Sequence, residues 1–253
     1  MDEPFAHGRG LMHRIDPRAR ILAAVVFSAS VAAMGQLAAA AAALGVALLL
    51  VMGAAPPIRP LGRRLASVSL FFGFLWLTTP LTMPGPTAWA WGPLHLSWPG
   101  IHLAAAVTLK GLAMILALIA LVATMHVATF GHALCRLGVP TPVAMLLLFT
   151  YRQVFLLHQV WTRLKDAARL RGFVPRTDAH SYRTIATMLG LVVVRALDHA
   201  GRAHEAMLLR GFSGTLTSVT TFRASWQDVA FGLTMAAISA ALTCMDIWGL
   251  PGR

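Results

Sequence analysis

The chain has 253 residues, of which 57% are hydrophobic and only 12% are charged. Soluble globular proteins carry roughly 25% charged residues, so this composition argues against a soluble domain and for a chain folded in a lipid bilayer. The net charge of +12 would suggest nucleic-acid binding in a soluble protein, but membrane proteins concentrate Lys and Arg in their cytoplasmic segments. The two cysteines, Cys135 and Cys244, have no close-spaced partner, so no disulfide framework or thiolate metal site is expected.

The first half of the chain predicts four membrane-spanning helices. Asp16 can cap the first of them, and Pro17 suits its first turn. Gly35-Gln36 is the only plausible break between the first two helices, which therefore form a tight hairpin. The predicted spans cover Ile21–Met34, Leu37–Gly53, Ala66–Leu81 and Ile101–Thr129.

The segments between these spans differ in charge. Pro56–Pro60 is expected to end the second helix, and Arg59, Arg63 and Arg64 lie before the third. The stretch Thr82–Gly100 holds four Pro, three Gly and three Trp but no charged residue, which indicates an interfacial loop with a short hairpin at Trp91–Trp98. Within the fourth span, Lys110 is expected to extend its ammonium group toward the outer interface.

Residues 130–226 carry 12 Lys/Arg and 4 Asp/Glu. Because charges recur every few residues, no stretch of this region is expected to span a membrane. Apolar residues nevertheless keep helical spacing, which predicts two amphipathic helices. Their apolar positions are Val154, Leu157, Trp161, Leu164 and Ala168 in the first, and Ile185, Met188, Val192, Ala196, Ala200, Ala203 and Met207 in the second.

A last span is predicted at Val229–Ile247, so the fold is an all-α polytopic membrane protein of about five transmembrane helices. Long amphipathic cytoplasmic helices lie between spans four and five. This divides the chain into residues 1–129, 130–226 and 227–253. The arginines of the N-terminal arm, of the loop after span two and of residues 130–226 all lie inside if the N-terminus is cytoplasmic. An arrangement with the last helix lying flat on the membrane stays open.

Both amphipathic helices end in the pattern A-x-x-L-R-G-F, at residues 167–173 and 206–212. Gly is preferred just past a helix, and Arg in the last turn complements the helix dipole, so one copy is explained as a helix stop. Two copies on adjacent helices favour recognition. Arg171 and Arg210 would form a fork-like surface that binds carboxylates in a partner's groove, because guanidinium binds carboxylate bidentately.

With these residues in view, the chain resembles the transmembrane coupling component of energy-coupling factor transporters, in particular the cobalt-type CbiQ branch. The resemblance rests on Asp16-Pro17-Arg18, the apolar hairpin, the Trp-rich loop, the Tyr151-Arg152 helix and both Arg-Gly endings. In that family, two Ala-Arg-Gly motifs end two coupling helices, and their arginines insert into grooves of two ABC-type ATPase subunits. The resemblance implies that the ATPase-coupling residues are Arg171, Arg210, Gly172, Gly211, Ala168, Ala206, Leu170, Leu209 and Arg169, with Leu170 and Leu209 standing where Ala is usual.

The resemblance also implies partners and a location. The family pairs this component with a substrate-binding membrane subunit, which in the cobalt branch is a metal-capturing, CbiM-like protein, with a small accessory membrane subunit as an optional addition. The substrate would be cobalt(II) for cobalamin biosynthesis, and nickel or a vitamin stays open. The protein would be a multi-pass component of the inner membrane with no nucleic-acid partner.

The sequence offers little support for other chemistry. It contains no G-x-S-x-G or Walker motif, and its ten His lack the i, i+4 pairing of a helical zinc site. No catalytic residue, cofactor or metal site is therefore expected in this chain, and ATP hydrolysis belongs to its partners. Two alternatives remain: an integral-membrane enzyme acting on a lipid or phosphorylated substrate, and a scaffold whose basic region binds anionic lipid.

Overall fold

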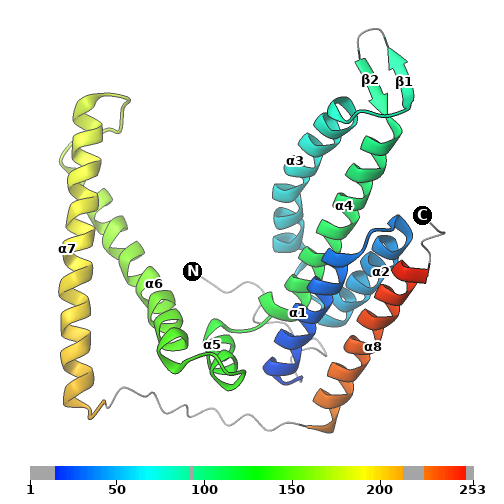
Figure 1. Cartoon of the computed structure of the whole chain (residues 1–253). Coiled ribbons are helices and arrows are strands. Elements are labelled where there is room, and N and C mark those ends of the chain that lie inside the picture. The colour runs from blue at the N-terminus through cyan, green and yellow to red at the C-terminus, as the bar shows by residue number, and fades with distance from the viewer. Residues whose placement is uncertain (1–14, 92–93, 213–224, 249–253) are drawn as a thin grey trace. The chain divides into compact units, whose positions relative to one another are not determined.

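The computed structural model describes residues 15–91, 94–212 and 225–248, and is almost entirely helical (Figure 1). It divides into two compact units. One, the bundle unit, holds the described residues of 15–130 together with 225–248. The other, the hairpin unit, holds residues 131–212. The predicted all-α, polytopic membrane fold is confirmed, with a two-stranded β-hairpin as its small non-helical element.

The bundle unit consists of five long helices and the β-hairpin. Helices α1, α2, α4 and α8 lie side by side, and α3 lies along α4 (Figure 1). The hairpin joins α3 to α4, as predicted, although its strands begin earlier in the chain than expected and its turn residues lie outside the described part. The bounds are α1 Pro17–Ala33, α2 Leu37–Ala54, α3 Ile58–Thr82, β1 Thr87–Trp91, β2 Leu94–Ser97, α4 Trp98–Leu118, its π-helical continuation η2 Ile119–Ala123, and α8 Trp226–Trp248.

Small residues form the core of this unit. Alanine stripes on α2 and α4 let the two helix backbones approach closely. In a bilayer, helices associate by such close packing, because the hydrophobic effect does not favour helix–helix over helix–lipid contact. Phe27 and Val31 of α1 are completely buried against them. The fully or almost fully buried alanines of these two helices are Ala39, Ala40, Ala43, Ala47 and Ala54 of α2 and Ala104, Ala113 and Ala117 of α4.

Two of the predicted boundaries are wrong. Helix α3 begins at Ile58, eight positions before the predicted start at Ala66, because Pro60 falls in its first turn. There a proline removes no helical hydrogen bond, since the first backbone N–H groups of a helix have no intrahelical acceptor. The fourth span was expected to reach Thr129, but helical structure after α4 stops with η2 at Ala123, and a separate helix, α5 (Val127–Arg136), follows.

The tight turn between α1 and α2 is held by two distant side chains. The carboxylate of Asp246 on α8 accepts hydrogen bonds from the backbone N–H groups of Gly35, at 2.9 and 3.0 Å, and Gln36, at 2.7 Å. It thereby caps the N-terminal end of α2. The ammonium group of Lys110 donates to the carbonyl oxygen of Met34 at the end of α1. Lys110 was expected to extend toward the outer interface, and in the structure its ammonium group caps α1 at the α1–α2 turn.

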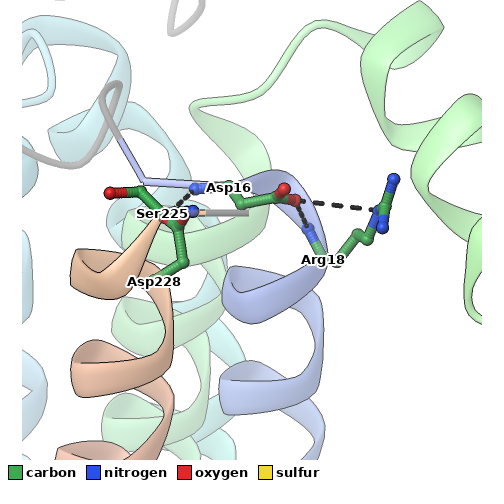
Figure 2. A network of polar contacts seen from close by, with 4 residues as sticks. All are labelled: Asp16, Arg18, Ser225 and Asp228. Atoms are coloured by element: carbon green, nitrogen blue, oxygen red, sulfur yellow. Dashed lines mark hydrogen bonds and ion pairs between the residues drawn. The ribbon is translucent and has the colours of Figure 1, made fainter. Parts of the chain in front are cut away.

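At the opposite end of the bundle, α1 is joined to the start of α8 and to the end of α4. The backbone N–H of Asp16 donates to Asp228 at 2.6 Å (Figure 2). The buried guanidinium of Arg20 donates to the carbonyl oxygen of Ala120 at 3.2 Å and to the hydroxyl of Thr124. Helix α4 therefore ends, and α8 begins, at the same end of the bundle. If the bundle spans the bilayer, the intervening chain crosses it an even number of times.

The hairpin unit contains two long antiparallel helices, α6 (Thr141–Leu170) and α7 (Ala179–Leu209), joined by a short connection (Figure 1). Asp178 caps α7 by accepting a hydrogen bond from the Ser181 N–H at 2.8 Å, and the Ser181 hydroxyl accepts from the Arg176 N–H at 3.0 Å. The apolar positions predicted on both helices line the spaces between them, among them Val154, Leu157, Ala200, Ala203 and Met207.

Within the described part of the chain, six helices are long and apolar enough to cross a membrane by length and composition: α2, α3, α4 with η2, α6, α7 and α8. Helix α1 has 17 residues, slightly fewer than the about 20 that a typical span needs. The expectation that no stretch of 130–226 is apolar enough is wrong, since residues 141–158 of α6 carry a single charged side chain, Arg152. Composition alone thus leaves the even number of crossings at zero or two.

Candidate functional site

The end of α6 is a glycine-capped helix stop. The N–H of Phe173 donates to the Ala168 carbonyl at 3.0 Å, and the N–H of Gly172 donates to the Arg169 carbonyl at 2.9 Å. Gly172 has φ +80°, a left-handed conformation in which a Cβ is unfavourable. This pair of hydrogen bonds is the Schellman motif, and it places Arg171 as the last residue before the chain turns away.

The end of α7 repeats the same geometry. The N–H of Phe212 donates to the Met207 carbonyl at 3.1 Å, and the N–H of Gly211 donates to the Leu208 carbonyl at 3.0 Å. Gly211 has φ +77°, and Arg210 occupies the position equivalent to Arg171. Both predicted helix stops are therefore confirmed, and the repeated sequence folds into the same local structure twice.

Each stop presents a leucine beside an arginine. Leu170 is 90% exposed and Leu209 is 89% exposed, and Arg171 and Arg210 are also exposed. Among the described residues, no ion pair or side-chain hydrogen bond involves either of these two arginines. Both pairs thus offer a large apolar side chain and a free guanidinium group to a partner, at the negative end of a helix dipole. Of the other predicted residues, Arg169 and Ala206 are exposed and Ala168 is half-buried.

The two stops do not form one fork. Arg171 lies at the connected end of the helix pair, where it lines a cleft with His180 and Thr184 from the first turns of α7. Arg210 lies at the other end of α7, whose 31 residues span about 46 Å at 1.5 Å per residue. The expectation of a single fork-like surface is wrong, because the helices are antiparallel and their C-terminal ends point in opposite directions. The two arginines therefore lie at opposite ends of α7.

Within the described residues, no group of three or more His, Cys, Asp or Glu side chains is placed to hold a metal ion. His7 and His13, like Arg9 and Arg14 of the N-terminal arm, lie outside the described residues. Sequence reasoning did not find the capping role of Asp228. The spacing Ser225-x-x-Asp228 at the start of α8 resembles a capping box and was the available signal.

Comparison with known proteins decides which family this arrangement belongs to. The family described as "CbiQ: Cobalt transport protein" matches residues 8–221, which include both helix stops. The chain belongs to the CbiQ family. It is also 27% identical, over 266 aligned residues, to the energy-coupling factor transporter transmembrane protein EcfT of Acidaminococcus fermentans, covering 96% of this chain and 95% of that protein. The resemblance noted from the sequence is therefore confirmed: the chain is a CbiQ-family protein and is similar to a transmembrane component of an energy-coupling factor transporter.

Proposed function

We propose that this CbiQ-family protein couples ATP hydrolysis by two ABC-type ATPase subunits to a separate substrate-binding membrane subunit. The observation that carries the proposal is the repeated helix stop. Two separate helix ends present the same exposed Leu–Arg pair on the same backbone geometry. A chain has no structural need for two such exposed pairs, whereas two copies of one ATPase would each need one.

The Leu–Arg pair suits a groove with an acidic residue at its base. Guanidinium pairs bidentately with carboxylate, and an arginine buried in an interface is a common source of binding energy. The leucine would add apolar area, about 25 cal/mol for each Å² removed from water. Leucine in place of the alanine usual in the family enlarges that contact. Because the two stops are far apart, each would dock into a different ATPase.

Charge supports a cytoplasmic position for both stops. The described Lys and Arg residues of the bundle unit, Lys110 excepted, lie toward the end where α1 and α8 begin, and they are Arg18, Arg20, Arg59, Arg63 and Arg64. Positive residues mark the cytoplasmic face of the inner membrane. The end of η2, which precedes the hairpin unit in the chain, and the start of α8, which follows it, both lie at this end. Helix α7 carries Arg183, Arg195 and Arg202 along its length, so we infer that α6 and α7 do not cross the membrane. The bundle unit then supplies five spans, α1, α2, α3, α4 with η2, and α8.

We expect an apolar surface of the hairpin unit to contact the substrate-binding subunit. Some of the predicted apolar positions, such as Leu157 and Ala203, are half-buried and line the space between α6 and α7. The exposed stripe Leu189, Val193 and Leu197, at i, i+4 and i+8 on α7, remains available for an apolar partner helix. Cobalt(II), captured by a CbiM-like subunit for cobalamin synthesis, is the proposed substrate because it agrees with the family description. Nickel or a vitamin would use the same coupling surfaces.

The test is the double variant Arg171→Ala with Arg210→Ala, co-expressed with the two ATPase subunits and the substrate-binding subunit. Membrane insertion should be unchanged, because both side chains are exposed and make no contacts that stabilise the fold. The ATPases should no longer co-purify, and uptake of radioactive cobalt(II) should fall to background. The matched control is Arg176→Ala with Arg183→Ala, which removes two exposed arginines of the same unit. Co-purification and uptake equal to this control would refute the proposal.

A further inference from the structure

We propose that the cleft midway along the α6–α7 pair binds the phosphate group of an anionic phospholipid. This cleft has a volume of about 370 Å³ and is separate from both helix stops. Its rim holds three arginines, Arg163 from α6 and Arg195 and Arg202 from α7. Leu156 and Val160 of α6 supply apolar walls, and Asp198 is its single carboxylate. The inference concerns a different surface from the proposed ATPase contacts.

Helical spacing brings the arginines together. Arg195, Asp198 and Arg202 stand at i, i+3 and i+7 on α7, so they share one face, and that face is turned toward α6. Val160 and Arg163 occupy one face of α6 in the same way. Because the helices are antiparallel, the middle of one lies opposite the middle of the other. The three guanidinium groups therefore converge on one space without any loop to position them.

The cleft has more positive charge than it can neutralise by itself. Among the described residues, no ion pair joins Asp198 to any of the three arginines, and none of the three has a side-chain hydrogen bond. Three guanidinium groups around one space repel each other, and a bound anion relieves that repulsion. Phosphate oxygens accept the paired N–H groups of guanidinium well. The expected ligand is thus a phosphate, not a neutral or cationic molecule.

The apolar side of the cleft distinguishes a lipid from a free anion. Residues 141–158 of α6 form an almost uncharged stretch, and the cleft runs from the later part of this stretch, at Gln153, to the charged residues that follow it, at Arg163. A phospholipid has the same order of parts, an acyl chain followed by a phosphate. Basic pockets between helices at the cytoplasmic face are the sites where such headgroups bind. Inorganic phosphate would make no use of the apolar walls.

The test is native mass spectrometry of the full-length protein released from nanodiscs that contain phosphatidylglycerol and phosphatidylcholine. We compare the wild type with the triple variant Arg163→Gln, Arg195→Gln and Arg202→Gln. The control variant, Arg136→Gln, Arg176→Gln and Arg183→Gln, removes the same charge from exposed positions of the same unit. The cleft variant should retain phosphatidylglycerol about a hundredfold less well than wild type and control, because it lacks three arginines that each contribute about 1 kcal/mol toward an anionic lipid. Phosphatidylcholine retention should stay equal in all three.

Two further arms decide between ligands. Inorganic phosphate or glycerophosphoglycerol, added in excess, should fail to displace the lipid. Displacement by either would overturn the lipid assignment. Co-purification of the ATPase subunits is measured on the same samples and should be unaffected. Equal lipid retention in the cleft and control variants would overturn the proposal, as would loss of the ATPases with unchanged lipid, which would assign the cleft to a protein partner.

Discussion

The carboxylate of Asp228 caps two helices at once. One oxygen accepts the backbone N–H of Asp16 at the start of α1, at 2.6 Å, and the other accepts the N–H of Ser225 at the start of α8, at 2.7 Å (Figure 2). Asp16 in turn accepts the N–H of Arg18 at 2.9 Å. Two parallel helices therefore begin side by side with a negative charge at both positive dipole ends. We call these hydrogen bonds of the Asp228 carboxylate to Asp16 and Ser225 the Asp228 clasp.

Replacing Asp228 should destabilise the bundle. In Asp228→Ala the N–H groups of Asp16 and Ser225 lose their acceptor, and leaving buried donors unsatisfied costs about 1–3 kcal/mol. Asp228 is only 7% exposed, so water cannot fully replace the carboxylate. Asp228→Asn keeps one acceptor oxygen and should have a smaller effect. Thermal unfolding in detergent measures the difference, with Asp166→Ala, an exposed carboxylate on α6, as the control. Equal melting temperatures for Asp228→Ala and the control would contradict the clasp.

The hydrogen bonds of Asp246 at the α1–α2 turn give a second prediction. Asp246→Ala removes the acceptor of the Gly35 and Gln36 N–H groups, and losing such a helix cap costs about 1 kcal/mol. The change should increase hydrogen exchange at these two amides specifically. Asp246→Asn should restore most of the protection, because its amide oxygen still accepts. Protection that is unchanged in Asp246→Ala would show that the turn does not depend on α8.

Much of this fold could be predicted from the sequence, because helix length, apolar runs and turn residues act locally. The Gly35-Gln36 turn, the last span and both glycine stops followed from such signals. The start of α3 was misplaced because Pro60 can either break a helix or occupy its first turn, and only the surrounding packing decides. The Asp16–Asp228 contact joins residues 212 positions apart, and no local pattern encodes that pairing.

The conformation of the two stop glycines should matter apart from the arginines. A Cβ at Gly172 or Gly211 would meet no atom within 4 Å, so alanine there is disfavoured only by the positive φ, by about 1–2 kcal/mol. Gly172→Ala with Gly211→Ala should turn the Leu–Arg pairs away and reduce ATPase co-purification although both arginines remain. Gly201→Ala, inside α7, is the control and should stabilise the helix. If the double variant captures ATPase as well as this control does, the backbone geometry is irrelevant to docking.

The cap of α7 should depend on pH. Hydrogen bonds from the side chain and then the backbone of Ser181 lower the pKa of Asp178 below its usual value. A carboxyl group whose pKa is lowered by folding stabilises the fold above its unfolded pKa of about 3.9, and this stability is lost as pH falls through the folded value. Protection of the Ser181 amide, corrected for intrinsic exchange, should therefore decrease only below about pH 4. Ser181→Ala should move that decrease to higher pH, and an unshifted profile would rule out this coupling.

For the candidate site, the sequence predicted the residues better than their arrangement. The repeated Arg-Gly ending identified Arg171 and Arg210, because a helix stop depends on neighbouring residues alone. Their separation depends on the antiparallel pairing of α6 and α7, which the pattern does not specify. The exposure of Leu170 and Leu209 could not be predicted from the sequence either, since leucine is more often buried.

Site-specific photo-crosslinking tests the central claim most directly. A photoreactive amino acid is placed at position 170 or 209 of the full-length protein in the assembled transporter, with position 182, an exposed site on α7, as the control. The account predicts that positions 170 and 209 each crosslink to an ATPase subunit, and that Arg171→Ala or Arg210→Ala abolishes only the crosslink at its own stop. Crosslinks from 170 and 209 to lipid or to the chain itself, with the ATPases captured elsewhere, would contradict it.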